Sequence, residues 1–329
     1  MAWRNPWYNS SLAHHTPQGF RNVDAPAHQP GDVERWRKER KAAGLPKPPS
    51  QGYDHFIRQW WQPVALNSEE EDGVWWLGHA SLLLRLNGRY ILTDPVFSPR
   101  VSPLPFAGPQ RKTPSVMSVD TLPTLDALVI SHNHYDHLDN ATVRQLLKRF
   151  PQLTIFVPLG LGEWCRRRGA KHVIELDWWQ SYVFEGLTFT AVPAQHWSMR
   201  RPWDRNRTLW CGWVMEGKHQ RFWFSGDTGY SPELLTIAQR LGPLDTVALP
   251  VGAYAPRWFM SINHMDPQSA VTLWQQLGMP KAIPVHWGVF ELADESLDEP
   301  VFELSQVLKD VAPDNDRFHI LRIGQYLSL

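Results

Sequence analysis

The pattern His-x-His-x-Asp-His at residues 132–137 constrains this chain more than any other feature does. An apolar run typical of a buried strand comes directly before it, so the pattern begins where a strand ends. Because alternate side chains of an extended segment point the same way, His132 and His134 can meet at one metal ion. The turn that follows can direct Asp136 and His137 to a second ion. The pattern therefore predicts a strand, a ligand-bearing loop and two neighbouring metal positions.

Other residues with metal-binding side chains follow other apolar runs. Such runs end at a common edge in open α/β folds, where ligands and catalytic groups gather. We therefore expect three more side chains to join those of the first motif. They are His196 after residues 187–192, Asp227 after residues 221–224 and His286 after residues 282–285.

Strand-like and helix-like patterns alternate in two parts of the chain, residues 74–170 and 182–329. In each part, strands are followed by amphipathic helices, and this alternation indicates an α/β fold. Helices are expected over residues 32–43, 53–61, 138–150 and 268–277.

The order of the seven candidate ligands resembles that of the metallo-β-lactamase superfamily. Longer segments around them resemble, more narrowly, the group of phospholipases D that hydrolyse N-acyl-phosphatidylethanolamine. The His-x-His-x-Asp-His pattern alone identifies only the superfamily, whereas these segments extend from about residue 75 to the C-terminus. They are WLGHA (76–80), LTDP (92–95), ISHNHYDHLD (130–139), FVPLG (156–160), VIELDWW (173–179), GDTGY (226–230), GAY (252–254), PRWFM (256–260) and HWG (286–288).

The resemblance implies a fold and a set of metal ligands. The fold is a four-layer αβ/βα sandwich of the metallo-β-lactamase type, formed by a catalytic domain over residues 73–329. A Pro- and Trp-rich extension over residues 1–72 is expected to pack on this domain. Zinc is the implied metal, although Mn²⁺ or Fe²⁺ could take the same positions. One zinc ion would be held by His132, His134 and His196, the other by Asp136, His137 and His286, and Asp227 would bridge them.

With these ions, the resemblance implies hydrolysis of N-acyl-phosphatidylethanolamine-like phospholipids to an N-acylethanolamine and a phosphatidic acid. A hydroxide bridging the two ions would attack the phosphorus, because zinc lowers the pKa of bound water to about 7. Asp136, Asp227 and His264 are the expected catalytic residues. Two other interpretations stay open. One is a hydrolase of small molecules such as sugar-phosphate lactones, and the other is a membrane-associated binding protein that retains a metal site without catalysis.

Three further residues have both a structural and a functional interpretation. His79 either lines the mouth of the site or anchors a strand turn. Asp94 is expected to orient a ligand histidine by a hydrogen bond rather than to bind metal itself. His264 precedes Asp266 and Pro267, which predict the start of a helix. It therefore either contacts phosphate or supplies a proton, or it belongs only to the loop.

The charge of the chain is balanced, with 33 basic and 33 acidic residues, which argues against a nucleic-acid partner. Basic residues are nevertheless concentrated in one loop. A loop after His196 with four arginines either steers a phosphate or an anionic membrane surface toward the metal ions or is simply solvated. The proline-rich loop over residues 99–112 is a candidate wall of the substrate entrance. The arginines are Arg200, Arg201, Arg205 and Arg207.

Contact with a membrane is expected to be peripheral, at the inner face. The sequence has no long apolar run and no signal-like start, and its 2 cysteines do not suggest a disulfide framework, so we expect a cytoplasmic protein. A homodimer remains an open alternative. Aromatic residues of the leader could face lipid, although packing is the favoured interpretation of the 18 tryptophans as a whole. These leader residues are Trp3, Trp7, Tyr8, Phe20, Trp60 and Trp61.

Overall fold

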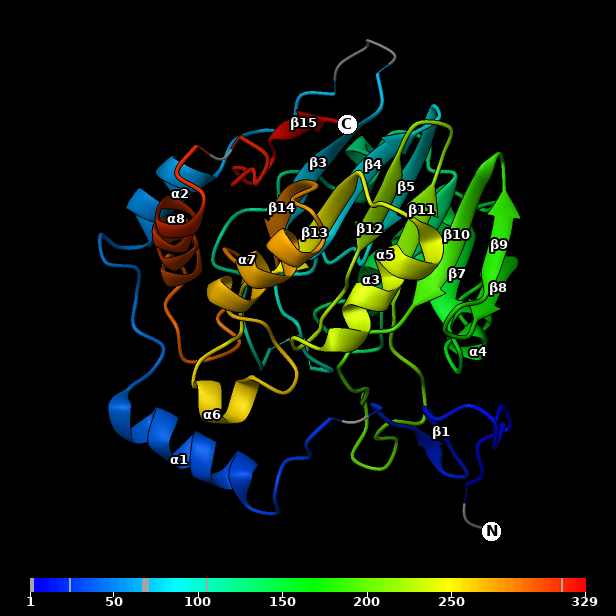
Figure 1. Ribbon diagram of the computed structural model, residues 1–329, viewed down its shortest axis with the longest axis horizontal. Coiled ribbons are helices and arrows are strands. Elements are labelled where there is room, and N and C mark those ends of the chain that lie inside the picture. Colours follow the sequence, from blue (N-terminus) through cyan, green and yellow to red (C-terminus); the bar gives the residue numbers. More distant parts are fainter. Residues whose placement is uncertain (1–2, 24, 67–70, 105, 315) are drawn as a thin grey trace.

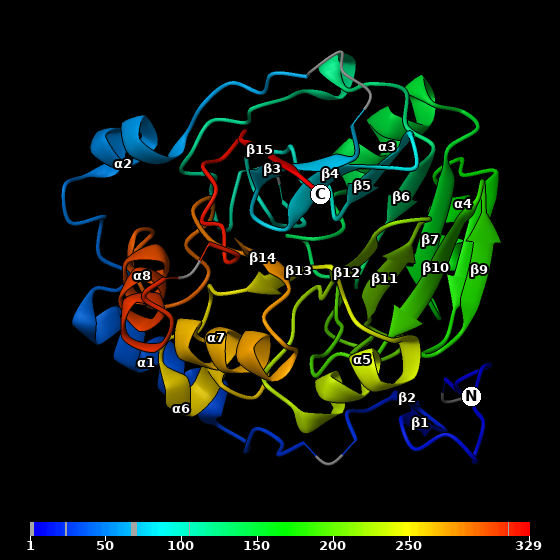
Figure 2. The same cartoon turned by 45° about the horizontal axis from the view of Figure 1, so that its top comes forward.

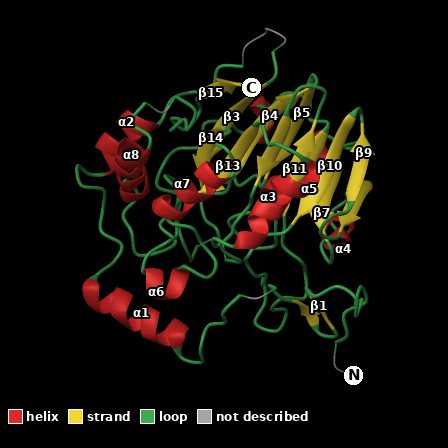
Figure 3. Ribbon diagram, in the orientation of Figure 1, coloured by secondary structure: helices red, strands yellow, loops and turns green. Residues whose placement is uncertain are grey.

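Two mixed β-sheets form the body of the protein in the computed structural model, which describes residues 3–23, 25–66, 71–104, 106–314 and 316–329. The sheets lie against each other, as the arrows in Figures 1 and 3 show. The 7-stranded sheet has the order β15 (Tyr326–Ser328), β3 (Gly73–Gly78), β4 (Ser81–Leu86), β5 (Arg89–Thr93), β6 (Ala127–Val129), β7 (Thr154–Pro158) and β8 (His172–Leu176). The 6-stranded sheet has the order β14 (Lys281–Val285), β13 (Thr246–Pro250), β12 (Arg221–Phe224), β11 (Gly212–Glu216), β10 (Leu187–Val192) and β9 (Ser181–Phe184).

Helices cover the outer sides of the two sheets, so the α/β fold expected from the sequence is confirmed. Figure 2 shows α5 and α7 beside the 6-stranded sheet and α3 on the side of the other. The expected helix over 138–150 is α3, and that over 268–277 is α7. The helices of this part are α3 (Asn140–Arg149), α4 (Gly162–Arg166), α5 (Leu235–Leu241), α6 (Arg257–Met260), α7 (Pro267–Gln276) and α8 (Glu299–Val311), with short 3₁₀ turns η1 (Val119–Thr121) and η2 (Pro232–Leu234).

The core has two layers because successive side chains of each buried strand point to opposite faces. On β3, Trp76 joins the cluster between the sheets, where it is buried together with Trp213 of β11. Its neighbour Trp75 joins the second cluster with Leu83 and with Val143 of α3. The interpretation of most tryptophans as packing residues is therefore confirmed for those of the core.

Four strands that precede candidate ligands end at one edge of the sandwich. In the first sheet, β5, β6, β7 and β8 pair in parallel. In the second, β12, β13 and β14 are parallel. Strand β10 has the same direction, since β11 lies antiparallel to both β10 and β12. The loops after β6, β10, β12 and β14 therefore approach one another across the two sheets.

The N-terminal segment lies along one side of the molecule, in blue in Figure 1, and contains β1 (His15–Thr16), β2 (Gly19–Phe20), α1 (Asp32–Ala43) and α2 (Tyr53–Trp60). Both expected helices are present. The prediction of a lipid-facing leader is wrong for Phe20, which is 2% exposed. Trp7, Trp60 and Trp61 are partly buried and pack against the main core, which agrees with a packing role. A domain division after residue 72 remains a prediction.

Among the described residues, none of the helices combines the length and the apolar character needed to cross a bilayer.

Candidate metal centre

Three imidazoles converge in a first group at the end of β6 and β10. The Nε2 atom of His132 lies 2.8 Å from Nδ1 of His134, and Nε2 of His196 lies 3.1 Å from the same atom. His132 and His196 are buried, and His134 is half-buried. Nitrogens that face one another at these distances form a cage in which one cation can be bound.

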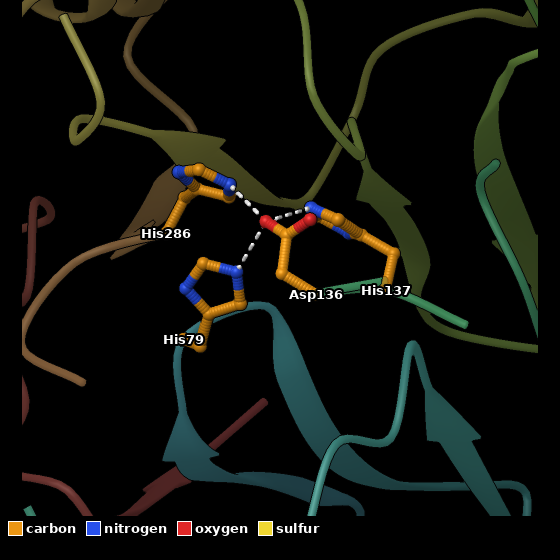
Figure 4. Close-up of side chains that lie close together, drawn as sticks. All are labelled: His79, Asp136, His137 and His286. Carbon is orange, nitrogen blue, oxygen red and sulfur yellow. Dashed lines mark hydrogen bonds and ion pairs between the residues drawn. The ribbon is translucent and has the colours of Figure 1, made fainter. Parts of the chain in front are cut away.

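A second group surrounds the carboxylate of Asp136, as Figure 4 shows. Its Oδ2 atom lies 3.2 Å from Nε2 of His137 and 3.3 Å from Nε2 of His286. The loop after β6 supplies Asp136 and His137, and the end of β14 supplies His286. Nε2 of His79, from the turn between β3 and β4, lies 3.0 Å from the same oxygen.

Asp227, which follows β12, faces both groups. Its Oδ2 atom lies 3.1 Å from Nε2 of His137 and 3.1 Å from Nε2 of His286 in the second group. The same oxygen lies 3.7 Å from His196 and 3.9 Å from His132 in the first. A carboxylate in this place can bind ions on both sides at once. The structure thus brings together all seven residues that the sequence selected.

Hydrogen bonds behind the centre determine which ring nitrogens face it. Nδ1 of His137 lies 2.7 Å from Asp94, and Nδ1 of His196 lies 3.1 Å from the carbonyl oxygen of Asn263. Because these partners only accept, each Nδ1 carries a proton and each Nε2 is turned toward the centre. The Ser131 hydroxyl donates its proton to Asp94 at 2.5 Å, so it accepts from Nδ1 of His132 at 2.9 Å. Three histidines are therefore oriented to bind metal through Nε2.

The histidines are of two kinds, those whose pKa is lowered and those whose pKa is raised. Burial lowers the pKa of His134 to about 4 and that of His196 to about 3, so both are neutral at neutral pH. Burial also lowers the pKa of His286, but the charge of Asp227 and hydrogen bonds to Asp136 and Asp227 outweigh it and raise this pKa to about 9. An ion bound beside His286 would replace the proton that these carboxylates otherwise stabilise.

Buried polar atoms that lack a hydrogen-bond partner gather at this centre within the described part of the chain. Such atoms are uncommon in folded proteins, and lone pairs among them would be satisfied by a cation. Imidazole nitrogens and carboxylate oxygens suit Zn²⁺, and Mn²⁺ or Fe²⁺ accept a similar set. The residues present therefore suit metal binding. The unpartnered atoms include Nε2 of His134, Nε2 of His137, Oδ1 of Asp227 and Nδ1 of His264.

Two residues with open interpretations lie inside the centre. The His264 ring is 5.1 Å from that of His196 and 5.4 Å from that of His286, so His264 is more than a loop residue. His79 anchors the turn between β3 and β4 and is too deeply buried to line the mouth of the site. Its ring is 1% exposed and contacts Asp136, and its carbonyl oxygen accepts from the backbone N–H of His286 at 3.0 Å. Its φ of 54° lies in the left-handed region, which few non-glycine residues adopt outside sites where the fold imposes it.

A cleft of about 270 Å³ leads to the centre, and Tyr135 separates it from a larger cavity of about 910 Å³. The loop over 99–112 contributes to both walls, as the sequence indicated; its residue 105 lies outside the described residues. The cleft is lined by Val101, His134, Tyr135, Asp136, Trp197, Asp227, Ala253, Met260, His264, His286 and Leu292.

The arginine loop after His196 differs from the sequence-based expectation at one position. Arg200 donates to the carbonyl oxygens of Asn133 and Leu138, both at 2.8 Å, and its guanidinium lies 4.0 Å from the centre of the Tyr135 ring. It therefore holds the ligand-bearing loop in place and is not free to steer a substrate. Arg201 is exposed beside the larger cavity.

Comparison with known proteins agrees with this architecture. Residues 89–287 match the family described as the beta-lactamase superfamily domain. N-acyl-phosphatidylethanolamine-hydrolyzing phospholipase D 1 of Caenorhabditis elegans is 41% identical over 244 residues, which are 71% of this chain and 68% of that protein. The chain belongs to the metallo-β-lactamase superfamily and to its N-acyl-phosphatidylethanolamine-hydrolysing phospholipase D group.

More distant relatives agree with this assignment. The mitochondrial N-acyl-phosphatidylethanolamine-hydrolyzing phospholipase D of Saccharomyces cerevisiae is 33% identical over 257 residues, which are 76% of this chain and 54% of that protein. A solved structure described as a possible metal-dependent hydrolase from Veillonella parvula has a TM-score of 0.66 at 19% identity and covers 79% of this chain and 100% of its own. That structure supports the fold. The family to which the chain belongs makes it a metal-dependent hydrolase.

Sequence reasoning missed two asparagines that contact His196. Asn263 accepts from its ring, and Asn22 hydrogen-bonds to its backbone. Neither lies in a recognisable motif, because their contacts join segments far apart in the sequence and exist only in the folded chain.

Proposed function

We propose that this chain is a dinuclear zinc phosphodiesterase. Its proposed substrates are N-acyl-phosphatidylethanolamine-like phospholipids, which it would cleave to an N-acylethanolamine and a phosphatidic acid. The observation that carries this proposal is the placement of Asp227 between two groups of metal-binding side chains. The substrate class is supported by the names of the relatives that are 41% and 33% identical.

The proposed roles of the protein groups follow from their contacts. His132, His134 and His196 would hold one ion, and Asp136, His137 and His286 would hold the other, with Asp227 shared. When bound, the two zinc ions would lower the pKa of a water molecule to about 7 and neutralise charge on the phosphoryl oxygens. The larger cavity beside Tyr135 offers arginine side chains for a lipid phosphate, and the cleft offers apolar ones for alkyl groups.

His264 is proposed to position the reacting phosphodiester. Burial lowers the pKa of His264 to about 3, so the ring is neutral at neutral pH. A neutral imidazole donates a hydrogen bond through its one N–H but does not carry a spare proton. We therefore infer that His264 donates a hydrogen bond to an oxygen of the substrate and is not a protonated general acid in the free enzyme.

The experiment measures products released from a long-chain N-acyl-phosphatidylethanolamine in mixed micelles by zinc-loaded protein. We expect phosphatidic acid and N-acylethanolamine from the wild type. Asp227→Asn should reduce this release to background, because an amide replaces the shared carboxylate. The matched control is Asp245→Asn, since Asp245 lies just before β13 and accepts from the backbone N–H of Arg221, away from the metal groups.

Turnover of phosphorylated sugar lactones without any lipid cleavage would contradict the proposed substrate. It would favour the small-molecule hydrolase instead. Absence of both activities in zinc-loaded protein would favour a non-catalytic metal-binding role.

A further inference from the structure

Asn22 of the N-terminal segment clamps the backbone of His196, a proposed metal ligand 174 residues away. Its Nδ2 donates to the carbonyl oxygen of His196 at 2.8 Å, and its Oδ1 accepts from the N–H of His196 at 3.1 Å. Oδ1 also accepts from Nε1 of Trp210 at 3.1 Å. Because a carbonyl only accepts and an N–H only donates, these partners determine the orientation of the amide. The contact is therefore specific to asparagine.

A second contact from the same segment reaches His196 through its ring. His28 Nε2 lies 3.2 Å from Nδ2 of Asn263, and the carbonyl oxygen of Asn263 accepts from Nδ1 of His196 at 3.1 Å. The His28 ring also packs on Phe259, with 4.4 Å between ring centres. The segment thus touches the supports of His196 on both sides, at its backbone and at the nitrogen that turns Nε2 toward the first metal group.

The path of the segment is tightly determined where it approaches the ligand. Phe20 donates its N–H to the carbonyl oxygen of Asn206 at 2.8 Å. A Cβ on Gly19 would lie 2.1 Å from that oxygen, and the φ of Gly19 is +144°, so only glycine fits there. We call residues 19–28, apart from residue 24 outside the described residues, the N-terminal strap. It lies outside the family match, which begins at residue 89.

We propose that Asn22 and His28 of the N-terminal strap are positioning residues for the metal position of His132, His134 and His196. This inference rests on the proposed metal function of these histidines. The hydrogen bonds of Asn22 and His28 reach His196 and Asn263, whereas His137 of the second group is held by Asp94, so the strap is expected to act on one of the two ions. Because supports behind a ligand determine its orientation, removal of Asn22 is expected to weaken binding of that ion about 10–100-fold.

The test uses zinc-loaded full-length protein, dialysed against increasing concentrations of a zinc chelator. Elemental analysis gives the number of ions retained at each concentration. We expect Asn22→Ala to release one ion at a chelator concentration about 10–100-fold lower than the wild type does, while the other ion leaves at an unchanged concentration. His28→Ala should shift the same ion by a smaller factor, since it acts through Asn263.

The matched control is Asn5→Ala. Asn5 donates to the carbonyl oxygens of Thr16 and of Gly19 at the start of the strap, at 3.1 and 2.8 Å, without touching His196, so this control separates a general loosening of the segment from loss of the contact with His196. Its release profile should match the wild type. Equal release from Asn5→Ala and Asn22→Ala, or wild-type release from Asn22→Ala, would overturn the proposal. A wild type that retains no zinc would instead refute the proposed function, so the two failures are distinguishable.

Discussion

At the scale of single residues, Asp94 connects the two metal groups from behind. It is fully buried and accepts from the N–H of Ser131 at 2.7 Å, from the Ser131 hydroxyl and from Nδ1 of His137. Through Ser131 it also determines the tautomer of His132. One carboxylate therefore holds a histidine of each group, His137 directly and His132 through Ser131.

We predict that Asp94→Asn weakens zinc binding in both groups by about 10–100-fold. An asparagine amide has one oxygen in place of the two of Asp94, so its NH₂ group must face at least one donor of Ser131 or His137, which loses its acceptor. Zinc retained during dialysis against a chelator measures the effect. Asp126→Asn is the control, because Asp126 accepts from Tyr90 and Arg89 near the other end of the strands. Retention equal to the wild type in Asp94→Asn would show that the ligands do not need this support.

At the scale of elements, a buried ion pair attaches the β1–β2 hairpin to the catalytic fold. His14 and His15 contact the two carboxylate oxygens of Asp177 at 2.7 and 2.8 Å. The His14 ring also stacks on Trp178, with 4.3 Å between ring centres. This attachment lies just before the N-terminal strap, so it determines where the strap begins.

The hairpin should detach in acid. Burial tends to raise the pKa of Asp177, but the hydrogen bond and charge of His14 and the charge of His15 outweigh it and hold this pKa below the usual 3.8. A carboxylate with a lowered pKa contributes stability above pH 3.8, and this contribution is lost as the pH falls through the folded value. Hydrogen-exchange protection of residues 14–20 should therefore fall in strong acid, as the pH passes through the folded pKa of Asp177.

Asp177→Asn provides the comparison for this titration. The variant lacks the titrating group, so its hairpin should be less protected already at neutral pH and should show no separate acid step. An acid step of unchanged size in Asp177→Asn would assign the transition to another group.

At the scale of the whole molecule, strongly exposed aromatic side chains occur outside the leader as well as in it, where Tyr8 is 45% exposed. Phe106 is 76% exposed and Trp203 is 63% exposed. They belong to the loops over 98–112 and 198–208, which line the same large cavity beside the metal cleft, together with Arg201. A surface that combines projecting aromatic rings with cations suits an anionic phospholipid bilayer. We propose these two loops as the membrane-contacting rim of the cleft.

We predict that Phe106→Ala and Trp203→Ala each weaken partition onto vesicles of anionic phospholipid by about tenfold, from the lost burial of an aromatic ring. Sedimentation with the vesicles measures the bound fraction. Phe302→Ala is the matched control, because Phe302 is 65% exposed on α8, outside the cavity lining. Cleavage of a micellar substrate should change less than cleavage in vesicles. Equal loss in all three variants, or none, would remove these loops from the membrane contact.

The local sequence was sufficient to predict the candidate ligands and the elements that carry them. Strand-like runs before His132, His196, Asp227 and His286 predicted that these side chains share an edge, because strand ends in a layered α/β fold meet there. Repeating apolar patterns likewise predicted α3 and α7, and the longer segments around the ligands predicted the superfamily. These inferences succeed because each depends on neighbours in the chain.

Only the tertiary structure decided which groups support the ligands and which surface is free. Asn22 and Asn263 carry no motif, since their contacts with His196 join segments far apart in the sequence. Arg200 looked free in the sequence but is used to hold the ligand loop, and Phe20 looked available to lipid but is buried. The sequence by itself determined which metal-binding types of side chain meet at the centre, because residue type and spacing along the chain are local properties. Which residues support a ligand, and which side chains are exposed, depends on packing between distant segments. No local sequence pattern contains that information.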